Sequence, residues 1–370
     1  MNIQLASGRG CYVTDTHGKK YLDLYGGHGV ISIGHSHPYY VQKITEQLNS
    51  IGFYSNSVRI AQQEELAFKL GELSGYPDYE LFLCNSGAEA NENALKLASF
   101  QNGRKKIISF TKSFHGRTSL AVEATDDKNL RAAVNSNGNV VFLSFNDEEA
   151  LKNAMDETTC AVIIEGIQGV GGVNVPEPTF MKLIGKLCEK YGAYFICDEI
   201  QSGYGRSGKF FAHQYAGIKP DLITVAKGMG NGFPVAGVLI SEKFTSKHGM
   251  LGTTFGGNYL ACAAAIAVLD VMKDELLIEN AAQTGDALIS KLRENNKVGP
   301  VRGKGLMIGF DPAGDATQLR KLLVAKGILT GSSGKTTIRL LPPLTVNREE
   351  LHEFTEILSE VITTKHTIEA

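Results

Sequence analysis

The chain has 370 residues, of which 43% are hydrophobic and 21% are charged, so it can form one or two globular domains and is not a disordered polypeptide. Its formal net charge of -2 provides no electrostatic footprint for nucleic acid or for an anionic membrane surface. No apolar run reaches the length of about 18 residues that a bilayer span needs.

The cysteines and the N-terminus bear on the compartment. No basic stretch followed by an apolar one stands at residues 1–8, so we find no secretory signal there. The six cysteines form no Cys-x-x-Cys pair, and several of them stand inside apolar runs. We therefore expect buried free thiols and a cytoplasmic protein.

Short apolar runs alternate with helical patterns through most of the chain. Two runs near the N-terminus alternate apolar and polar residues, at 10–14 and 20–24. Seven later runs have the length and composition of strands, at 80–84, 106–110, 140–143, 161–164, 193–197, 222–225 and 236–240. Helical patterns stand at 88–100, 178–191 and 258–273. This alternation predicts an α/β domain with a large, mostly parallel, seven-stranded sheet that is covered on both faces.

The pattern changes near residue 274. A helix is followed by short strands at 305–310 and 337–341 and by a last helix that starts at residue 348. These elements predict a smaller α+β domain, and we expect the first 45 residues to pack with it. The expected division is therefore a large domain at 46–260 and a small domain built from 1–45 and 261–370.

Two ionisable residues follow strands at the same edge of the predicted sheet. Asp198 follows the run at 193–197, and Lys227 comes two residues after the run at 222–225 and opens a glycine-rich turn. In open α/β sheets, ligands bind at this edge. An amine that forms a Schiff base and a carboxylate that keeps a pyridine nitrogen protonated suit pyridoxal phosphate. Solvated side chains at the strand ends are the ordinary alternative.

Two further motifs follow strand-like runs. Asn85-Ser-Gly-Ala-Glu-Ala90 opens a helical pattern, where free N–H groups and the helix dipole suit a phosphate; a simple capped turn is the alternative. Ser113-Phe-His-Gly-Arg117 offers an aromatic ring that can stack on a flat ring and an arginine that can bind a carboxylate. An exposed basic loop would explain the second motif equally well.

Three other patterns are set aside. Gly203-Tyr-Gly-Arg-Ser-Gly208 matches a dinucleotide fingerprint but begins several residues after its strand. Gly334-Lys-Thr336 resembles the end of a P-loop, yet Leu329 stands where the first glycine is required. His35 and His37 have no third metal ligand nearby, which favours roles in a cap or a turn.

Taken together, the motifs resemble those of the class III, or ω-amino-acid, aminotransferases of PLP fold type I. Within that family the chain is most similar to the acetylornithine and succinylornithine branch. The matching stretches occur in the family's order over almost the whole chain, at 20–25, 34–38, 85–92, 113–118, 165–169, 198–206, 226–232, 252–258 and 338–343.

This resemblance implies a role for each residue around the cofactor ring. Lys227 would be the Schiff-base lysine and the proton shuttle. Asp198 would pair with the pyridine nitrogen, and Gln201 would lie near the ring hydroxyl. Phe114 would stack on the ring.

The resemblance also implies how the phosphate and the substrates are held. Gly87 and Ala88 would hold the phosphate. Thr254 would complete that site from the neighbouring subunit of a homodimer with shared active sites, and Thr253 beside it would lie near the substrate. Arg117 would bind the α-carboxylate of the donor.

Arg339 resembles the arginine that binds the carboxylate of 2-oxoglutarate, and here the chain departs from the family. The family has a second glutamate in the motif that starts at Glu165, and this glutamate usually pairs with the arginine. In this chain Val170 stands in its place. We therefore hypothesise that the donor itself carries a distal carboxylate, as N-succinylornithine does. A second departure is the family's N-terminal arm, which we expect to be short or to precede this numbering.

The implied activity is a two-step transamination in arginine biosynthesis. The terminal amino group of N-acetyl- or N-succinylornithine would pass to 2-oxoglutarate, giving the N-acylglutamate semialdehyde and glutamate. No metal, nucleic acid or membrane partner is implied. The alternatives are another class III enzyme that acts on ornithine, 4-aminobutyrate or acyl-diaminopimelate, a class III aminomutase or decarboxylase, and a PLP-binding protein without turnover.

Overall fold

The computed structural model describes residues 2–368, with side chains through residue 362. Its α-helices are α1 (Gly26–Gly29), α2 (Pro38–Ser50), α3 (Ala61–Ser74), α4 (Gly87–Asn102), α5 (Ser119–Glu123), α6 (Glu148–Ala154), α7 (Pro178–Tyr191), α8 (Tyr259–Asp274), α9 (Leu277–Glu294), α10 (Ala316–Ala325) and α11 (Arg348–Ile368). Its strands are β1 (Leu5–Arg9), β2 (Tyr12–Asp15), β3 (Lys20–Asp23), β4 (Glu80–Cys84), β5 (Lys106–Phe110), β6 (Val140–Leu143), β7 (Thr159–Glu165), β8 (Tyr194–Asp198), β9 (Leu222–Val225), β10 (Ala236–Ile240), β11 (Val298–Lys304), β12 (Met307–Pro312), β13 (Ile328–Leu329), β14 (Gly331–Ser333) and β15 (Thr337–Leu340).

The seven predicted strands form one sheet in the order β4-β10-β9-β8-β7-β5-β6. The strands from β9 to β6 are parallel, whereas β10 runs antiparallel to both of its neighbours. The predicted large, mostly parallel sheet is therefore confirmed. Parallel neighbours bring their carboxyl ends to one edge, and this arrangement positions the site.

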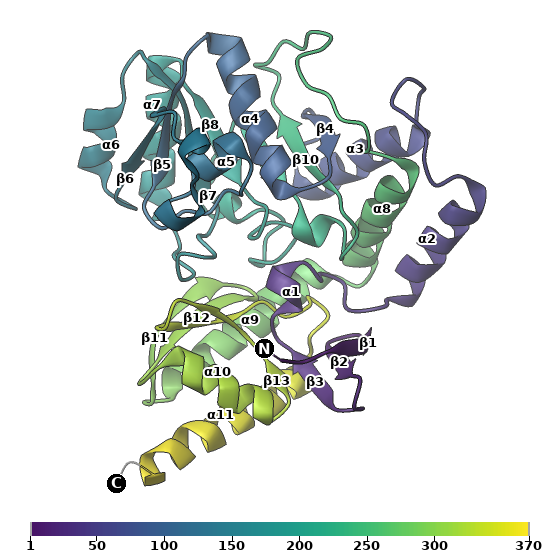
Figure 1. Cartoon of the computed structure of the whole chain (residues 1–370), viewed down its shortest axis with the longest axis vertical. Coiled ribbons are helices and arrows are strands. Elements are labelled where there is room, and N and C mark those ends of the chain that lie inside the picture. The colour runs from purple at the N-terminus through teal and green to yellow at the C-terminus, as the bar shows by residue number, and fades with distance from the viewer. Residues whose placement is uncertain (1, 369–370) are drawn as a thin grey trace.

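Alternate residues of the central strand β7 face opposite layers of helices. Ala161 and Ile163 belong to the apolar cluster that includes α4, whereas Val162 and Ile164 belong to the cluster that includes α7. Both faces of the strand are buried, so the strand reads as a continuous apolar run in the sequence. Figure 1 shows α4 and α7 with this sheet in the upper half of the molecule.

The lower half of the molecule in Figure 1 combines the two ends of the chain. Strands β1, β2 and β3 form a sheet with β13, in which β3 and β13 are parallel partners. A second sheet has the antiparallel order β11-β12-β15-β14. Strand β3 near the N-terminus thus pairs with an element of the C-terminal part, and the small domain at 1–45 and 261–370 stays a prediction.

The expected domain boundaries fall inside helices. The first, at residues 45 and 46, lies in α2, and the second, at residues 260 and 261, lies in α8. These two helices pack against each other, and the Tyr39 hydroxyl of α2 donates a hydrogen bond to Asp270 of α8 over 3.0 Å. The division into a large domain at 46–260 and a small domain stays a prediction. Helices α2 and α8 each cross one of its expected boundaries.

All six cysteines are free and buried, as the sequence predicts. Burial raises the pKa of the Cys262 thiol to about 12, which makes it a poor nucleophile. Among the described helices, none has both the length and the apolar character that crossing a bilayer requires.

Candidate active site

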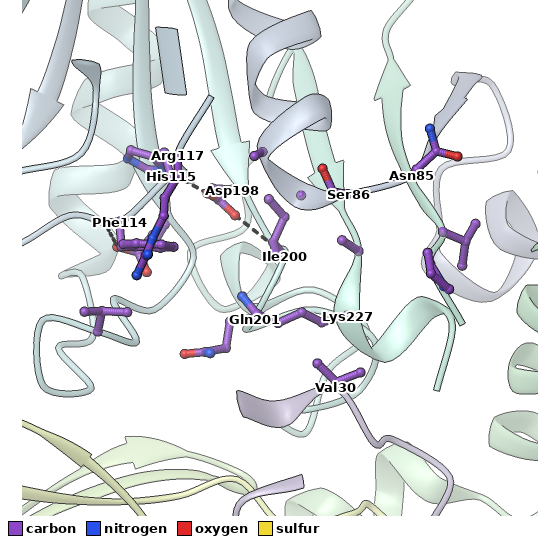
Figure 2. A pocket seen from close by; sticks show the side chains of 18 of the residues that line it. Val30, Asn85, Ser86, Phe114, His115, Arg117, Asp198, Ile200, Gln201 and Lys227 are labelled. Atoms are coloured by element: carbon purple, nitrogen blue, oxygen red, sulfur yellow. Dashed lines mark hydrogen bonds and ion pairs between the residues drawn. The ribbon is translucent and has the colours of Figure 1, made fainter. Parts of the chain in front are cut away.

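Three neighbouring strands end at a cavity of about 420 Å³. Glu165 ends β7 and Asp198 ends β8, where the two residues are direct partners across the sheet. Lys227 follows β9 at the same edge. The cavity is lined by these predicted site residues: Gly87, Ala88, Phe114, Arg117, Asp198, Gln201 and Lys227 (Figure 2).

The carboxylate of Asp198 is held by three hydrogen bonds. Its Oδ2 accepts from Asn91 Nδ2 over 2.7 Å and from His115 Nδ1 over 2.8 Å, and its Oδ1 accepts from the backbone N–H of Ile200 over 3.0 Å. Asn91 is itself oriented by the Thr224 hydroxyl, which donates to its Oδ1. The buried carboxylate is thus fixed in one orientation at the cavity wall.

Lys227 is the residue in this cavity with the most unusual backbone. Its φ of 47° lies in the left-handed region, which costs a non-glycine residue about 1–3 kcal/mol and is often found at functional sites. Burial lowers the pKa of its amine and Arg339 adds repulsion, while Asp198 opposes the shift. Figure 2 shows the side chain extended between Ile200 and Gln201. A lysine with a lowered pKa supplies the neutral amine that nucleophilic chemistry needs.

The N-terminus of α4 forms one wall of the cavity. Ser86 caps the helix by accepting from the N–H of Glu89 over 3.2 Å, and the N–H groups of Gly87 and Ala88 in the first turn have no acceptor within the helix. A Cβ at Gly87 would lie 2.9 Å from the Ile200 side chain, so a larger residue would require Ile200 to shift. The arrangement leaves free N–H donors and a positive dipole end, which suit a phosphate.

Phe114 and Arg117 come from the loop after β5. The backbone N–H of Phe114 donates to the Glu165 carboxyl over 3.1 Å, which fixes the position of the aromatic residue beside the cavity. The Arg117 side chain is exposed at the rim, and it forms no ion pair with any residue that the structure describes. It is therefore free to bind a carboxylate from outside.

Arg339 lies near the Lys227 cavity without lining it. It lies on β15 and is 4% exposed. Its Nε donates to the carbonyl of Ser332 over 3.1 Å, and its Nη2 donates to the Tyr25 hydroxyl over 3.2 Å. Its Nη1 has no partner among the described residues, and no described carboxylate lies within ion-pair distance of the guanidinium. A buried guanidinium of this kind favours an anionic ligand.

A family model described as "Aminotransferase class-III" matches residues 1–362. This chain belongs to the class III aminotransferase family. It is therefore a transaminase, and the predicted PLP fold type I is confirmed.

Named relatives cover nearly the whole of this aminotransferase. A protein from Archaeoglobus fulgidus named "Acetylornithine aminotransferase" is 43% identical over 359 residues, which are 96% of this chain and 94% of that protein. A protein of the same name from Bacillus cereus is 40% identical, over 98% of this chain and 96% of its own length. Among solved structures, the ornithine aminotransferase of Toxoplasma gondii, described with partial occupancy of PLP at its active site, has a TM-score of 0.92 and 28% identity, over 100% of this chain and 92% of that one.

Three of the predicted residues of this aminotransferase do not line the Lys227 cavity of their own chain: Arg339, Thr253 and Thr254. Thr253 accepts a hydrogen bond from Asn85 over 3.4 Å and lines a second hollow of about 710 Å³ beside the first strand of the sheet. Thr254 is exposed and borders neither hollow. In a single chain these threonines stay away from the reacting groups.

Sequence reasoning gave no role to Glu165, His115 or Asn91. Glu165 ends a strand at the same edge as Asp198, so the strand-end argument that found Asp198 also applies to it. His115 stands inside the quoted motif 113–118, but its bond to Asp198 depends on a contact across 83 positions. Asn91 lies on the buried face of α4, and no local signal separates it from an ordinary helical residue.

Proposed function

We propose that this transaminase moves the terminal amino group of an N-acylated ornithine to 2-oxoglutarate, with pyridoxal phosphate bound in the Lys227 cavity. One observation carries the proposal: the Lys227 amine and the fixed carboxylate of Asp198 face one cavity beside the open N-terminus of α4. The relatives named acetylornithine aminotransferase support the donor class and a place in arginine biosynthesis.

The residues present fit this cofactor. Gly87 and Ala88 would hold the phosphate, Asp198 would hold the pyridine nitrogen, and Phe114 would cover the ring. The Oε1 of Gln201 is buried without a hydrogen-bond partner among the described residues, and a ring hydroxyl would supply the missing donor. When bound, the cofactor supplies the electron sink that makes the carbon–hydrogen bond next to the nitrogen acidic.

The protein's own part in the chemistry is to bind carboxylates and to move a proton. Arg117 at the rim and Arg339, which lies close enough to Lys227 to affect the pKa of its amine, would bind the carboxylates of the donor and of 2-oxoglutarate. The lowered pKa lets the Lys227 amine accept a proton from the substrate carbon and return it, as general base and then as general acid. The products would be the N-acylglutamate semialdehyde and glutamate.

We also propose a homodimer in which Thr254 of each subunit completes the phosphate site of the other. Thr254 is exposed, and the neighbouring Phe255 is 59% exposed in the single chain. The Phe255 ring contacts Phe53, which is also exposed, at 5.4 Å between ring centres. An exposed pair of aromatic rings beside a functional threonine is typical of an interface. The cytoplasmic location stays a prediction.

Two measurements on the same variants test the function: the covalent attachment of the cofactor and the rate of transamination. Purified protein supplied with pyridoxal phosphate should be yellow, and borohydride reduction followed by peptide mapping should place the cofactor on Lys227. Lys227→Ala should lose both the attachment and the activity, whereas the exposed control Lys291→Ala should keep both. Attachment at another lysine would overturn the assignment of the site.

Turnover distinguishes the donor classes. N-acetylornithine, N-succinylornithine, ornithine, 4-aminobutyrate and acyl-diaminopimelate should be compared at a saturating concentration of 2-oxoglutarate. We expect ping-pong kinetics and the highest kcat/KM for an N-acylornithine. A clear preference for ornithine or 4-aminobutyrate would overturn the proposed donor while leaving the transaminase in place.

A further inference from the structure

A chain of hydrogen bonds connects Arg339, through Tyr25 and His28, to the cavity residue Gln201. Arg339 Nη2 donates to the Tyr25 hydroxyl over 3.2 Å, and the hydroxyl lies 2.5 Å from His28 Nδ1. The backbone carbonyl of His28 accepts from Gln201 Nε2 over 2.9 Å. His28 has a left-handed φ of 71° in a run of glycines, which turns its ring back toward Tyr25. One histidine thus connects the arginine of the small domain to a cavity residue of the large one.

The direction of this chain follows from the groups themselves. A guanidinium only donates, so the Tyr25 hydroxyl accepts from Arg339 and has its single proton left to give. Burial raises the pKa of Tyr25, so the hydroxyl keeps that proton. The proton can be donated to His28 Nδ1 when the ring is neutral and carries its own proton on Nε2, and this is the tautomer that completes the chain.

The charges around the ring favour this neutral form. Partial burial lowers the pKa of His28, and the nearby cations Arg339 on β15 and Arg320 on α10 lower it further, as does Lys227 whenever its amine is protonated. The groups that act on the ring are all cations, apart from the Tyr25 hydroxyl. A negative charge placed at Arg339 would offset this repulsion and favour a protonated ring.

We propose that His28 is a positioning residue for Arg339, and that binding of a carboxylate there is coupled to proton uptake by His28. The inference rests on the proposed function in one respect, since it takes Arg339 as the group that binds the carboxylate. A protonated ring cannot accept from Tyr25, so the hydroxyl becomes free to donate to the bound carboxylate. By linkage, the affinity for a dicarboxylate then rises as the pH falls.

The size of the effect is limited by solvent. The His28 side chain is partly open to water, so its added charge is screened. For one coupled proton the affinity changes by at most about tenfold per pH unit, and we expect a total gain of about threefold to tenfold between pH 8 and pH 6.

The test uses the holoenzyme and glutarate, a dicarboxylate without a carbonyl, which cannot undergo transamination. Calorimetric titration at pH 6, 7 and 8, in buffers of different ionisation enthalpy, gives the affinity and the number of protons taken up. The matched variant is His28→Asn, because asparagine tolerates a left-handed backbone and places an oxygen acceptor where Nδ1 stands, yet does not titrate. We expect proton uptake by the wild type and clearly less by His28→Asn, with similar affinities at pH 8.

Two results would overturn the inference in distinguishable ways. If His28→Asn takes up as many protons as the wild type, His28 is not the coupled group, whereas the proposed function is untouched. If glutarate binds equally well to Arg339→Lys, the carboxylate assignment fails and the inference fails with it. Burial raises the pKa of Glu165 to about 7, so Glu165 could also take up a proton in this pH range. The wild type and His28→Asn are therefore also measured with the added change Glu165→Gln, which cannot take up a proton there.

Discussion

His115 donates a hydrogen bond to Asp198 over 2.8 Å, and both side chains are sealed inside the large domain. A carboxylate only accepts, so the shared proton belongs to His115 Nδ1. With Asn91 on the same oxygen, the pair fixes the direction in which Asp198 presents its charge to the cavity. This geometry can serve the proposed role only if residue 198 is an anion.

Asp198→Asn removes that anion while keeping the shape of the side chain. We expect kcat/KM to fall by about a hundredfold to a thousandfold, because an oriented charge in a site with little water is lost. The amide oxygen can replace Oδ2 and accept from Asn91 and His115, but the NH2 group then faces the backbone N–H of Ile200, which is also a donor. Steady-state kinetics with an N-acylornithine measures the loss, and Asp286→Asn on the exposed face of α9 is the control. Activity within threefold of the wild type would contradict the role.

Glu165 should make stability depend on pH. Burial raises its pKa to about 7 from an ordinary value of 4.5, with repulsion from Asp198 and opposing effects of His115 and two backbone N–H groups. The native state therefore binds the proton more tightly than the unfolded state. The free energy of unfolding should fall as the pH rises from about 4.5 to about 7, by at most about 3 kcal/mol for this residue.

The measurement is urea unfolding at several pH values for the wild type and for Glu165→Gln. The glutamine keeps the size and an acceptor but cannot titrate, so this part of the slope should disappear. Glu294→Gln, on an exposed side chain, should leave the slope unchanged. An identical slope in all three proteins would show that Glu165 does not carry the raised pKa.

Much of the large domain could be predicted because its strands are buried on both faces. Strands β4, β5, β6, β9 and β10 have the predicted bounds, since each is a short apolar run between polar residues. Strand β7 starts two residues earlier than predicted and ends one residue later, at Glu165, and β8 is shifted by one residue and ends at Asp198. Both ends move because pairing between the two strands continues into the charged residues. Hydrophobicity alone does not show that continuation.

Other elements were not predicted. Helix α2 carries Tyr40, Ile44 and Leu48 at helical spacing, but none of its residues is buried, and Val41 and Leu48 are 49% and 62% exposed. Strand β13 has two residues, which is too short for a periodic signal. The Tyr25–His28–Arg339 chain spans 314 positions and joins the short helix α1 to strand β15. Such contacts come from tertiary structure and have no local signature.

Arg206 should be a stabilising link between separate segments. It is buried without an ion pair among the described residues, and its guanidinium donates to the carbonyls of Pro342, of Leu306 at 3.4 Å and of Ile31 at 3.5 Å. Arg206→Met keeps most of the volume but leaves these carbonyls without a donor. We expect a loss of about 3 kcal/mol in the free energy of unfolding.

The matched control for this change is Arg293→Met. Arg293 donates to one carbonyl, that of Val301, at the surface, so its replacement should cost no more than about 0.5 kcal/mol. Thermal and urea unfolding of both variants beside the wild type give the comparison. Equal midpoints for Arg206→Met and Arg293→Met would show that the buried charge costs as much as its hydrogen bonds return.

Val170→Glu tests whether the free Arg339 admits a donor with a distal carboxylate. Val170 is 44% exposed at the cavity, and its carbonyl accepts from Ser333 on β14, the strand that pairs with β15. A carboxylate added there would compete with substrate carboxylates for the guanidinium. We expect the KM for 2-oxoglutarate to rise about threefold to tenfold, and kcat/KM for N-succinylornithine to fall relative to N-acetylornithine. Val170→Gln has the same length as Val170→Glu without the charge. It should change neither the KM for 2-oxoglutarate nor the ratio of the two donors' kcat/KM values by more than about twofold. Two results together would rule out a donor whose distal carboxylate binds Arg339. They are a wild-type preference for N-acetylornithine over N-succinylornithine and a preference that Val170→Glu leaves unchanged.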